Sequence, residues 1–526
     1  MPDETTERKL RGRGEMEDSL AKRFVSKIGS SILSLPLNFF QQWLVTRALG
    51  PSEYGSISLL MGIFVELFVI LDSGTSIGFY VKLCARTYEI KLVTFYWRFA
   101  NLLGILSIVL VSIIISSGLI GRILPGYATM SVLLALLSAY GLWLTGIAVR
   151  VFDANGQTVV GEKWRIAVRA ISLLALLTQN YISKLTVNSF LLNQVGFSVI
   201  LILVLQRVLR FYGLSLHPKC RLSSIEVKQY LVEFWKYSSP VFVFGLISSI
   251  SLMIERWLLD LFGGKVEQGF YGLAVQISTI CFLVANAMIP LLSREIARDF
   301  ADKNFTRISF ELTTQIPRLY FISGLFGAFM VFEADLITQI VGGDQYKNAE
   351  LATALMCLYP IHQTIGQING SYFYSTGQTR LHQKIGIFNL SWGLVFTALF
   401  LGPKEWGGFS LGSVGLSFKT VFVQMVAVNI QLYYIGRQLM FSVKALILKQ
   451  VLVLGFLLIF SFCSKNISCE LSSVKIIQVL LNVFIFFGLS TILVLIWPGC
   501  VSLSRSVVSL EGIRTLARQF TIFGKI

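Results

Sequence analysis

Long apolar runs separated by short polar segments dominate this chain of 526 residues. Each run has about 17 to 25 residues, which is enough for a helix to cross a hydrocarbon core of about 30 Å. The pattern predicts an all-α polytopic membrane protein with about fourteen transmembrane helices. We place these helices at 24–49, 57–80, 99–120, 128–149, 166–182, 190–208, 241–262, 271–292, 316–337, 351–371, 385–401, 411–434, 445–463 and 476–497.

The predicted helices form two lobes of six around a central cavity, followed by two further helices. The first apolar run is of full membrane length and follows a segment of mixed charge, so we expect it to remain as an anchor rather than a cleaved signal peptide. The predicted domains are a cytoplasmic segment at 1–23, the first lobe at 24–208, a cytoplasmic basic linker at 209–237, the second lobe at 238–437, helices thirteen and fourteen at 438–498, and a cytoplasmic amphipathic tail at 499–526.

The composition excludes an ordinary soluble domain, because 54% of residues are hydrophobic and only 14% are charged. Soluble domains carry about 25% charged residues. With the N-terminus inside, lysines and arginines number 35 on the cytoplasmic segments and 8 on the outer ones, as the positive-inside rule requires. We therefore predict a multi-pass inner-membrane protein with both termini in the cytoplasm. Despite the net charge of +17, the partner expected for its basic segments is anionic membrane lipid and not nucleic acid.

Two short matches indicate an internal repeat. The pair Tyr54-Gly55, between helices one and two, recurs as Tyr271-Gly272, 217 residues later. The triplet Gly156-Gln157-Thr158, between helices four and five, recurs as Gly377-Gln378-Thr379, 221 residues later. Glycine favours short turns in any case, so the corresponding positions carry the inference rather than the glycines alone. Because six helices separate the copies, the lobes should insert with the same polarity.

Five segments carry a resemblance to a known family: TRALGPSEYG at 46–55, LDSG at 71–74, ERWLLD at 255–260, YGLA at 271–274 and GQTR at 377–380. They resemble polysaccharide exporters of the O-antigen flippase type, within the multidrug/oligosaccharidyl-lipid/polysaccharide (MOP) flippase superfamily. The resemblance covers about residues 24–440. It implies translocation of an undecaprenyl-diphosphate-linked oligosaccharide to the outer leaflet for surface polysaccharide synthesis, by alternating access. It further implies coupling to H+ or Na+, no ATP or other cofactor, and other polysaccharide assembly proteins as partners.

Basic side chains in or near the predicted helices are the candidates for binding the cargo. An ionisable group inside a span costs about 2.5 to 3.5 kcal/mol, so it usually faces a cavity or a partner. A guanidinium can hold phosphate oxygens with two parallel hydrogen bonds. Arg256 is therefore the first candidate and Lys419 the second, with Arg47 and Arg98 guiding the headgroup near helix ends. As an alternative, Arg256 pairs with a carboxylate or snorkels to the interface.

Acidic and neutral polar residues in the helices are candidates for ion coupling and for the cavity lining. A carboxylate that binds and releases a proton inside the membrane can couple transport to a gradient. Glu66, Asp72 and Glu255 are the candidates, although Asp72 could instead cap a helix end. The expected polar lining of the cavity consists of Asp260, His362, Gln363 and Gln367.

Two other functions stay open. A cation-coupled drug or metabolite antiporter of the same superfamily would need a smaller and more acidic cavity. A membrane polysaccharide polymerase would need a sizeable outer loop, and every outer connection here is short, so we expect no enzyme and no catalytic residues. The scattered histidines predict no metal site. Cys463 and Cys469 flank a short segment placed outside, where a disulfide is an alternative to free thiols.

Overall fold

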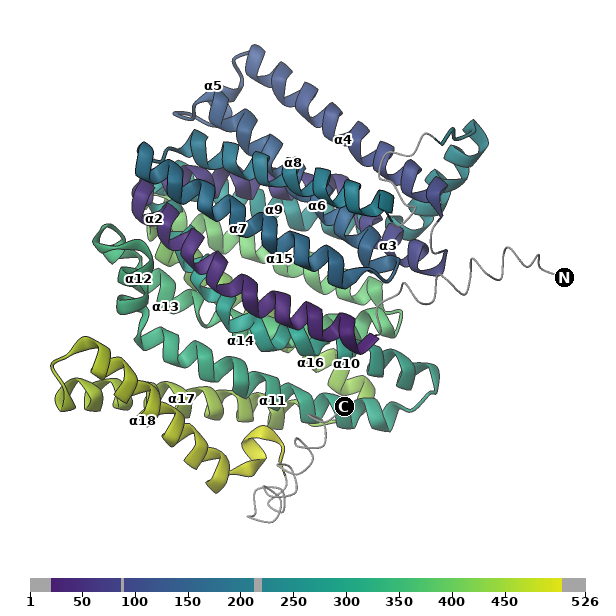
Figure 1. Cartoon of the computed structure of the whole chain (residues 1–526). Coiled ribbons are helices and arrows are strands. Elements are labelled where there is room, and N and C mark those ends of the chain that lie inside the picture. The colour runs from purple at the N-terminus through teal and green to yellow at the C-terminus, as the bar shows by residue number, and fades with distance from the viewer. Residues whose placement is uncertain (1–19, 87–88, 212–219, 504–526) are drawn as a thin grey trace. The chain divides into compact units, whose positions relative to one another are not determined.

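The chain folds into helices joined by short turns (Figure 1). A computed structural model describes residues 20–86, 89–211 and 220–503, and these ranges contain no strand. The α-helices are α2 (Leu20–Asp72), α3 (Thr75–Ala85), α4 (Ile90–Ser116), α5 (Ile120–Ile123), α6 (Thr129–Ala154), α7 (Thr158–Ile182), α8 (Val187–Phe211), α9 (Ser224–Ser278), α10 (Leu283–Ala301), α11 (Phe305–Phe332), α12 (Ala334–Gly342), α13 (Glu350–Met356), α14 (Tyr359–Ser375), α15 (Thr379–Leu401), α16 (Gly412–Leu439), α17 (Val443–Leu471) and α18 (Lys475–Ile496).

Helices of membrane length account for most of the described chain. Ten helical stretches there are long and apolar enough to cross a membrane. Two of them, Leu33–Asp72 and Phe242–Phe282, have 40 and 41 residues, and in each a non-helical glycine separates two helices. The more polar α7 and α13–α14 occupy the positions predicted for helices five and ten. The predicted all-α polytopic fold is therefore confirmed.

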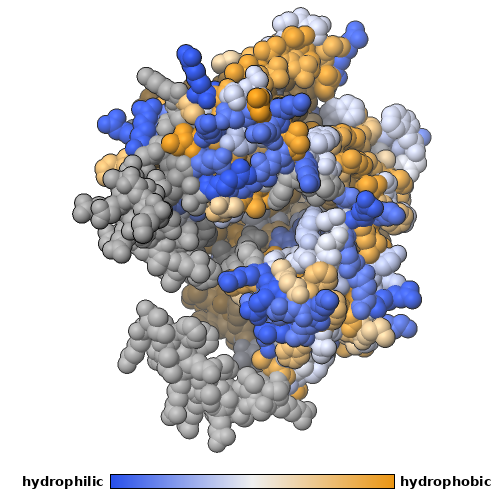
Figure 2. Space-filling view, turned by 90° about the vertical axis from the view of Figure 1, so that its right-hand side faces the viewer, coloured by the Kyte–Doolittle hydropathy of each residue, from blue (hydrophilic) through white to orange (hydrophobic). Residues whose placement is uncertain are grey.

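The flank of α4 presents large apolar side chains to its surroundings. Six of them are between 49% and 59% exposed: Leu102, Ile105, Leu106, Val109, Leu110 and Ile113. Their spacing places them along one side of the helix. A continuous apolar face of this kind is unfavourable in water, so lipid is its expected environment. Figure 2 shows hydrophilic side chains gathered over the helix ends that face the viewer, with hydrophobic side chains along the flanks.

The turns inside α2 and α9 have the same backbone geometry. Gly50 has φ 72° and ψ 175°, and Gly264 has φ 78° and ψ 178°, a region that essentially only glycine adopts. The two glycines are 214 residues apart. The repeat therefore aligns Gly55 with Gly269, and the predicted pairing of Gly55 with Gly272 is in the wrong register. The turn conformation, and not the neighbouring tyrosine, decides which positions correspond.

The second match has the same local geometry in both copies. Gly156 and Gly377 have φ angles of 76° and 71°. In each turn the following residue donates its N–H to the carbonyl oxygen five residues earlier, at 2.9 Å from Gln157 and 2.8 Å from Gln378. Both are helix C-caps of the Schellman type. Similar tripeptides thus form similar turns, which supports the repeat at this position.

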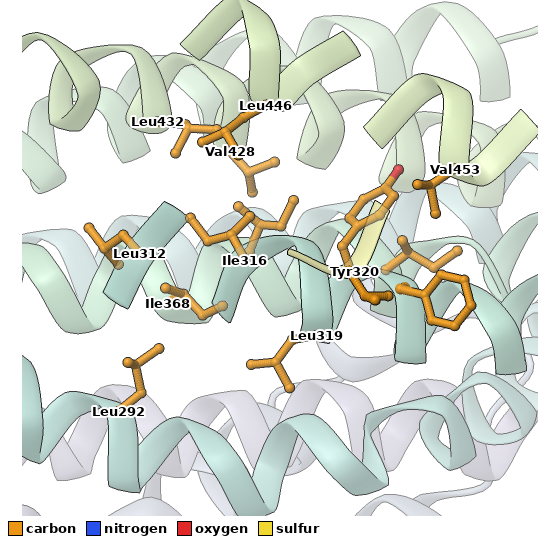
Figure 3. Close-up of a cluster of buried hydrophobic side chains, with 14 of the residues drawn as sticks. Leu292, Leu312, Ile316, Leu319, Tyr320, Ile368, Val428, Leu432, Leu446 and Val453 are labelled. Atoms are coloured by element: carbon orange, nitrogen blue, oxygen red, sulfur yellow. The ribbon is translucent and has the colours of Figure 1, made fainter. Parts of the chain in front are cut away.

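The chain forms two compact units, residues 1–269 with 341–345, and residues 270–340 with 346–526. In the first unit α2 packs on α6 and α7, and α8 packs on α6. In the second unit α17 packs on α11 and α18. The core drawn in Figure 3 comes from α10, α11, α14, α16 and α17: Leu292, Leu312, Ile316, Leu319, Tyr320, Ile368, Val428, Leu432, Leu446 and Val453. The lobe boundaries placed at 209–237 and 437 stay predictions.

Helix two ends earlier than predicted. Ser73 and Gly74 have φ angles of 46° and 77°, which ends α2 at Asp72, and α3 begins at Thr75. The linker prediction also changes, because α9 already begins at Ser224. The predicted N-terminal segment to residue 19 and the tail at 504–526 lie outside the described residues.

The disulfide alternative is wrong. Helix α17 continues to Leu471, so Cys463 and Cys469 lie on one helix as free thiols. Six residues of helix separate their Cα atoms by about 9 Å. Cα atoms more than about 7 Å apart cannot be bridged.

Candidate functional site

Arg256 lies against the second half of α2. Its Nη1 donates a hydrogen bond to Ser58 Oγ at 3.0 Å. A Cβ atom built on Gly62 would lie 3.6 Å from Arg256 Nε, so the side chain runs along the helix surface between these two positions. Glu66 follows one turn later on the same face, because residues four apart are neighbours on a helix. The Arg256 side chain therefore lies along one face of α2, made of Ser58, Gly62 and Glu66, which we call the Arg256 stripe.

This stripe lies within the spanning length of the helices. Ser58 follows Gly50 by eight residues and Arg256 precedes Gly264 by eight, which is about 12 Å from each turn. A guanidinium that donates to a hydroxyl at this depth does not have the geometry of a side chain snorkelling to the interface.

Asp260 belongs to a second polar cluster, closer to the turn in α9. The Tyr127 hydroxyl donates to Asp260 Oδ1 at 2.6 Å. Lys265 Nζ donates to the carbonyl oxygen of Gly126 at 2.6 Å and lies 4.4 Å from the centre of the Tyr127 ring. Burial, followed by the hydrogen bond to the Asp260 carboxylate, raises the pKa of Tyr127. Tyr127 is thus a neutral donor that ties the loop before α6 to α9.

Asp72 is held by four hydrogen bonds. It accepts from the backbone N–H of Ser76 at 3.2 Å and from the Ser76 hydroxyl at 2.7 Å, so it caps the first turn of α3. The Tyr96 hydroxyl and the Trp143 indole each donate to Oδ1 at 3.1 Å. The capping interpretation of Asp72 has this geometry in its favour, and its ion-coupling role stays a prediction.

The other candidates of the first unit lie in three different environments. Glu255 is buried, with 6% of its surface exposed. Arg47 is exposed, and its Cζ lies 5.4 Å from the centre of the Trp43 ring. Arg98 donates to the carbonyl oxygen of Cys220 at 3.0 Å. Arg47 is close to the turn in α2 and Arg98 to the start of α4, so they occupy opposite ends of the helices.

Lys419 is buried in the second unit, on α16. Only 6% of its surface is exposed. A Cβ atom built on Gly393 of α15 would lie 3.5 Å from Lys419 Nζ. The missing side chain at position 393 therefore makes room for the ammonium group.

The polar candidates of helix ten lie on α14. His362 is 5% exposed, and its ring centre lies 6.0 Å from that of Tyr320. Gln363 Oε1 accepts a hydrogen bond from Gln424 Nε2 of α16 at 2.6 Å. Gln367 is half-buried on the same helix. Gln424 was not predicted, although it is a polar residue within a predicted apolar helix.

Two further buried carboxylates were not predicted as site residues. Glu162, 3% exposed, accepts from Ser30 at 2.7 Å and pairs with Arg165 at 2.5 Å. Glu333, 5% exposed, accepts from Asn482 at 2.5 Å. The acid-base spacing of three residues in α7 was the available signal for Glu162. Glu333 lay within predicted helix nine, and the charge there was the available signal.

Ion pairs join α3 and α4 to the start of α9. Lys82 lies 2.6 Å from Glu233, and Arg86 pairs with the same carboxylate. Burial raises the pKa of Glu233, but the hydrogen bond from Lys82 and the charges of Lys82 and Arg86 outweigh it and leave that pKa below its ordinary value. Lys91 lies 2.5 Å from Glu226, and this hydrogen bond lowers the pKa of Glu226. Both carboxylates are therefore ionised at neutral pH.

No protein family model and no curated protein matches the chain. Solved structures do match it. The structure described as the lipid II flippase MurJ in an inward closed conformation has a TM-score of 0.66 and 14% identity, over 89% of this chain and 98% of that one.

Two structures of a multidrug resistance MATE family transporter of the MOP superfamily match as well. The inward-facing one has a TM-score of 0.60 and 16% identity, over 78% of this chain and 95% of that one. The outward-facing one has a TM-score of 0.56 and 14% identity, over 81% and 96%. At these identities the likeness concerns the fold. The chain therefore has the multi-pass membrane fold of MOP superfamily transporters.

Proposed function

We propose that this protein is a flippase that moves an undecaprenyl-diphosphate-linked oligosaccharide to the outer leaflet of the inner membrane, for synthesis of a surface polysaccharide such as O-antigen. The observation that carries the proposal is the Arg256 guanidinium inside the spanning length, hydrogen-bonded to Ser58. Such a charge is costly in a membrane, so one that is present usually has a function. A diphosphate matches the paired donors of a guanidinium.

The fold supports a lipid-linked cargo, because it is shared with a protein named for flipping lipid II. Alternating access is the mechanism we propose, with Lys419 as a second contact for the diphosphate. Glu66 would couple the movement to a gradient of H+ or Na+, since it lies on the Arg256 stripe of α2. A change in the charge of Glu66 would then act directly on the surroundings of the cargo-binding group.

A cation-coupled drug antiporter is the second candidate. Three acidic residues favour it, because Glu255 and Asp260 lie on α9 together with Arg256, and Glu66 lies on α2, against which Arg256 packs. The fold is also shared with MATE transporters. An organic cation would bind these carboxylates, whereas a diphosphate would bind the arginine.

The decisive experiment compares a deletion strain with strains that carry variants of the full chain. The deletion should accumulate the lipid-linked oligosaccharide in the cytoplasmic leaflet. Arg256→Ala should restore transport at least about tenfold less well than the wild type, as the loss of a hydrogen bond to a charged group predicts. Arg294→Ala is the matched control, because Arg294 is exposed on α10. Membrane levels of the variants should be equal.

Two results would overturn the proposal. The first is the absence of accumulation in the deletion strain, and the second is full transport by Arg256→Ala. Increased drug sensitivity of the deletion strain without accumulation would instead support the antiporter.

A further inference from the structure

A cavity of about 310 Å³ lies at one end of the first unit. Its lining comes from four connections: the turn in α2, the loop before α6, the loop before α8 and the turn in α9. All four are predicted to face outside. The volume is at the small end of the range of about 300 to 1,000 Å³ for ligand sites, which suits a single ring rather than a whole oligosaccharide.

Neutral hydrogen-bonding groups dominate this outer pocket. Four hydroxyls, one amide and one phenol line it: Ser52, Ser56, Ser131, Thr186, Asn188 and Tyr127. Hydroxyl and amide groups both donate and accept hydrogen bonds. A sugar ring carries hydroxyls with the same dual capacity around its edge, so this lining is complementary to a sugar.

Contacts made within the protein hold these groups in place. Ser131 is 7% exposed and donates to Asn188 Oδ1 at 2.7 Å, so the two N–H donors of the Asn188 amide point away from that bond. Tyr127 is held by its hydrogen bond to Asp260, and Lys265 is held by Gly126. Groups fixed before binding lose less conformational entropy when a ligand arrives.

The charges of the outer pocket favour an uncharged ligand over a phosphate. Its lining contains one carboxylate, Glu53, and one ammonium, Lys265. The ammonium is already engaged with a backbone carbonyl and the Tyr127 ring. A phosphate site would instead present converging arginines or lysines.

We infer that the outer pocket binds a sugar ring of the cargo glycan, at a site separate from the Arg256 stripe. That the sugar belongs to a lipid-linked cargo rests on the proposed function. That the pocket binds a sugar rests on the lining of the pocket alone. A lipid-linked glycan that reaches the outer side would thereby gain contacts that its diphosphate does not provide.

The test is saturation-transfer NMR on the full-length protein in lipid nanodiscs. The probes are millimolar D-glucose, D-galactose and N-acetyl-D-glucosamine, with inorganic phosphate as a competitor. At least one sugar should give a signal with the wild type, and Asn188→Leu should weaken it by up to about tenfold, as the loss of a neutral hydrogen bond of about 0.5 to 1.5 kcal/mol predicts. Asn466→Leu is the matched control, since Asn466 is an exposed amide on α17. Thr186→Val keeps the shape of the pocket and should weaken the signal even if Asn188→Leu misfolds.

Three outcomes overturn the inference: no sugar signal, equal signals from the wild type and both pocket variants, or displacement of the sugar by phosphate. The deletion strain separates this result from the proposed function. A strain that accumulates no lipid-linked oligosaccharide contradicts the flippase while leaving sugar binding measurable. A flippase that binds no sugar contradicts only the role of the outer pocket.

Discussion

The two carboxylates of helix two have different surroundings. Asp72 accepts hydrogen bonds from Ser76, Tyr96 and Trp143, so its oxygens are committed to joining α2, α3, α4 and α6. Glu66 is half-buried on the stripe where Arg256 lies. At the scale of residues, Asp72 is therefore expected to stabilise the fold, and Glu66 to serve transport.

Substituting these residues separates the two roles. Asp72→Asn should lower the free energy of unfolding by about 1 to 3 kcal/mol, because an amide leaves donors around it unsatisfied. Glu66→Gln should leave the melting temperature near that of the wild type and make transport insensitive to an imposed ion gradient. Thermal unfolding and vesicle transport with and without a gradient measure both effects. Loss of gradient dependence in Asp72→Asn alone would reverse the assignment.

At the scale of elements, the part of α2 that follows Gly50 crosses the part of α9 that follows Gly264 in reciprocal close contacts. A Cβ atom on Gly55 would lie 1.8 Å from the carbonyl oxygen of Lys265, and one on Gly269 would lie 2.1 Å from that of Pro51. The 214-residue offset exchanges Gly55 with Gly269 and Pro51 with Lys265. Two-fold related copies make reciprocal contacts of this kind. The crossing therefore supports the repeat independently of the turn conformation.

The turn glycines provide the prediction at this scale. Gly50→Ala and Gly264→Ala should each destabilise the protein by about 1 to 3 kcal/mol, because a side chain strains this backbone conformation. Gly146 is the control, since it is helical, exposed and has no atom near its Cβ position. Gly146→Ala should be neutral or stabilising by up to about 1 kcal/mol. Thermal unfolding measures all three, and equal melting temperatures would remove the argument for matched turns.

At the scale of the whole molecule, contacts within the first unit agree with the predicted alternation of the connections. The four connections placed outside line one pocket. The segments placed inside are joined at the other end by the ion pairs of Glu233 and Glu226. This grouping requires an even number of helices between connections on the same side, and the direction of insertion stays a prediction from the loop charges.

Cysteine labelling tests that direction. Lys347 and Lys444 are both exposed, the first before α13 and the second at the start of α17. In a chain whose seven native cysteines are replaced, a membrane-impermeant maleimide should label Lys347→Cys in intact cells and Lys444→Cys only after lysis, because basic loops remain in the cytoplasm. The opposite labelling pattern would invert the topology.

Much of the fold, and less of the site, was predictable from local properties of the chain. Run length alone predicts helices, and α15 ends at the predicted residue, Leu401. Helix two was predicted too long, since Gly74 interrupts an apolar run without changing its hydropathy. Gln424 and Ser58 were not predicted as site residues, because the neighbouring sequence of a single polar residue in a helix does not indicate which distant side chain it contacts.

The sequence by itself determined the all-α membrane fold and the order of its helices, because the hydropathy of each segment is set locally. It also singled out Glu255 and Lys419 among the buried charges, since these stand out against apolar neighbours, but not Glu162 or Glu333. The tertiary structure alone decided their surroundings: Arg256 meets a serine 198 positions away, Asp72 meets donors from three helices, and the four connections enclose a pocket. Such contacts depend on packing between segments distant along the chain, and no local pattern encodes them.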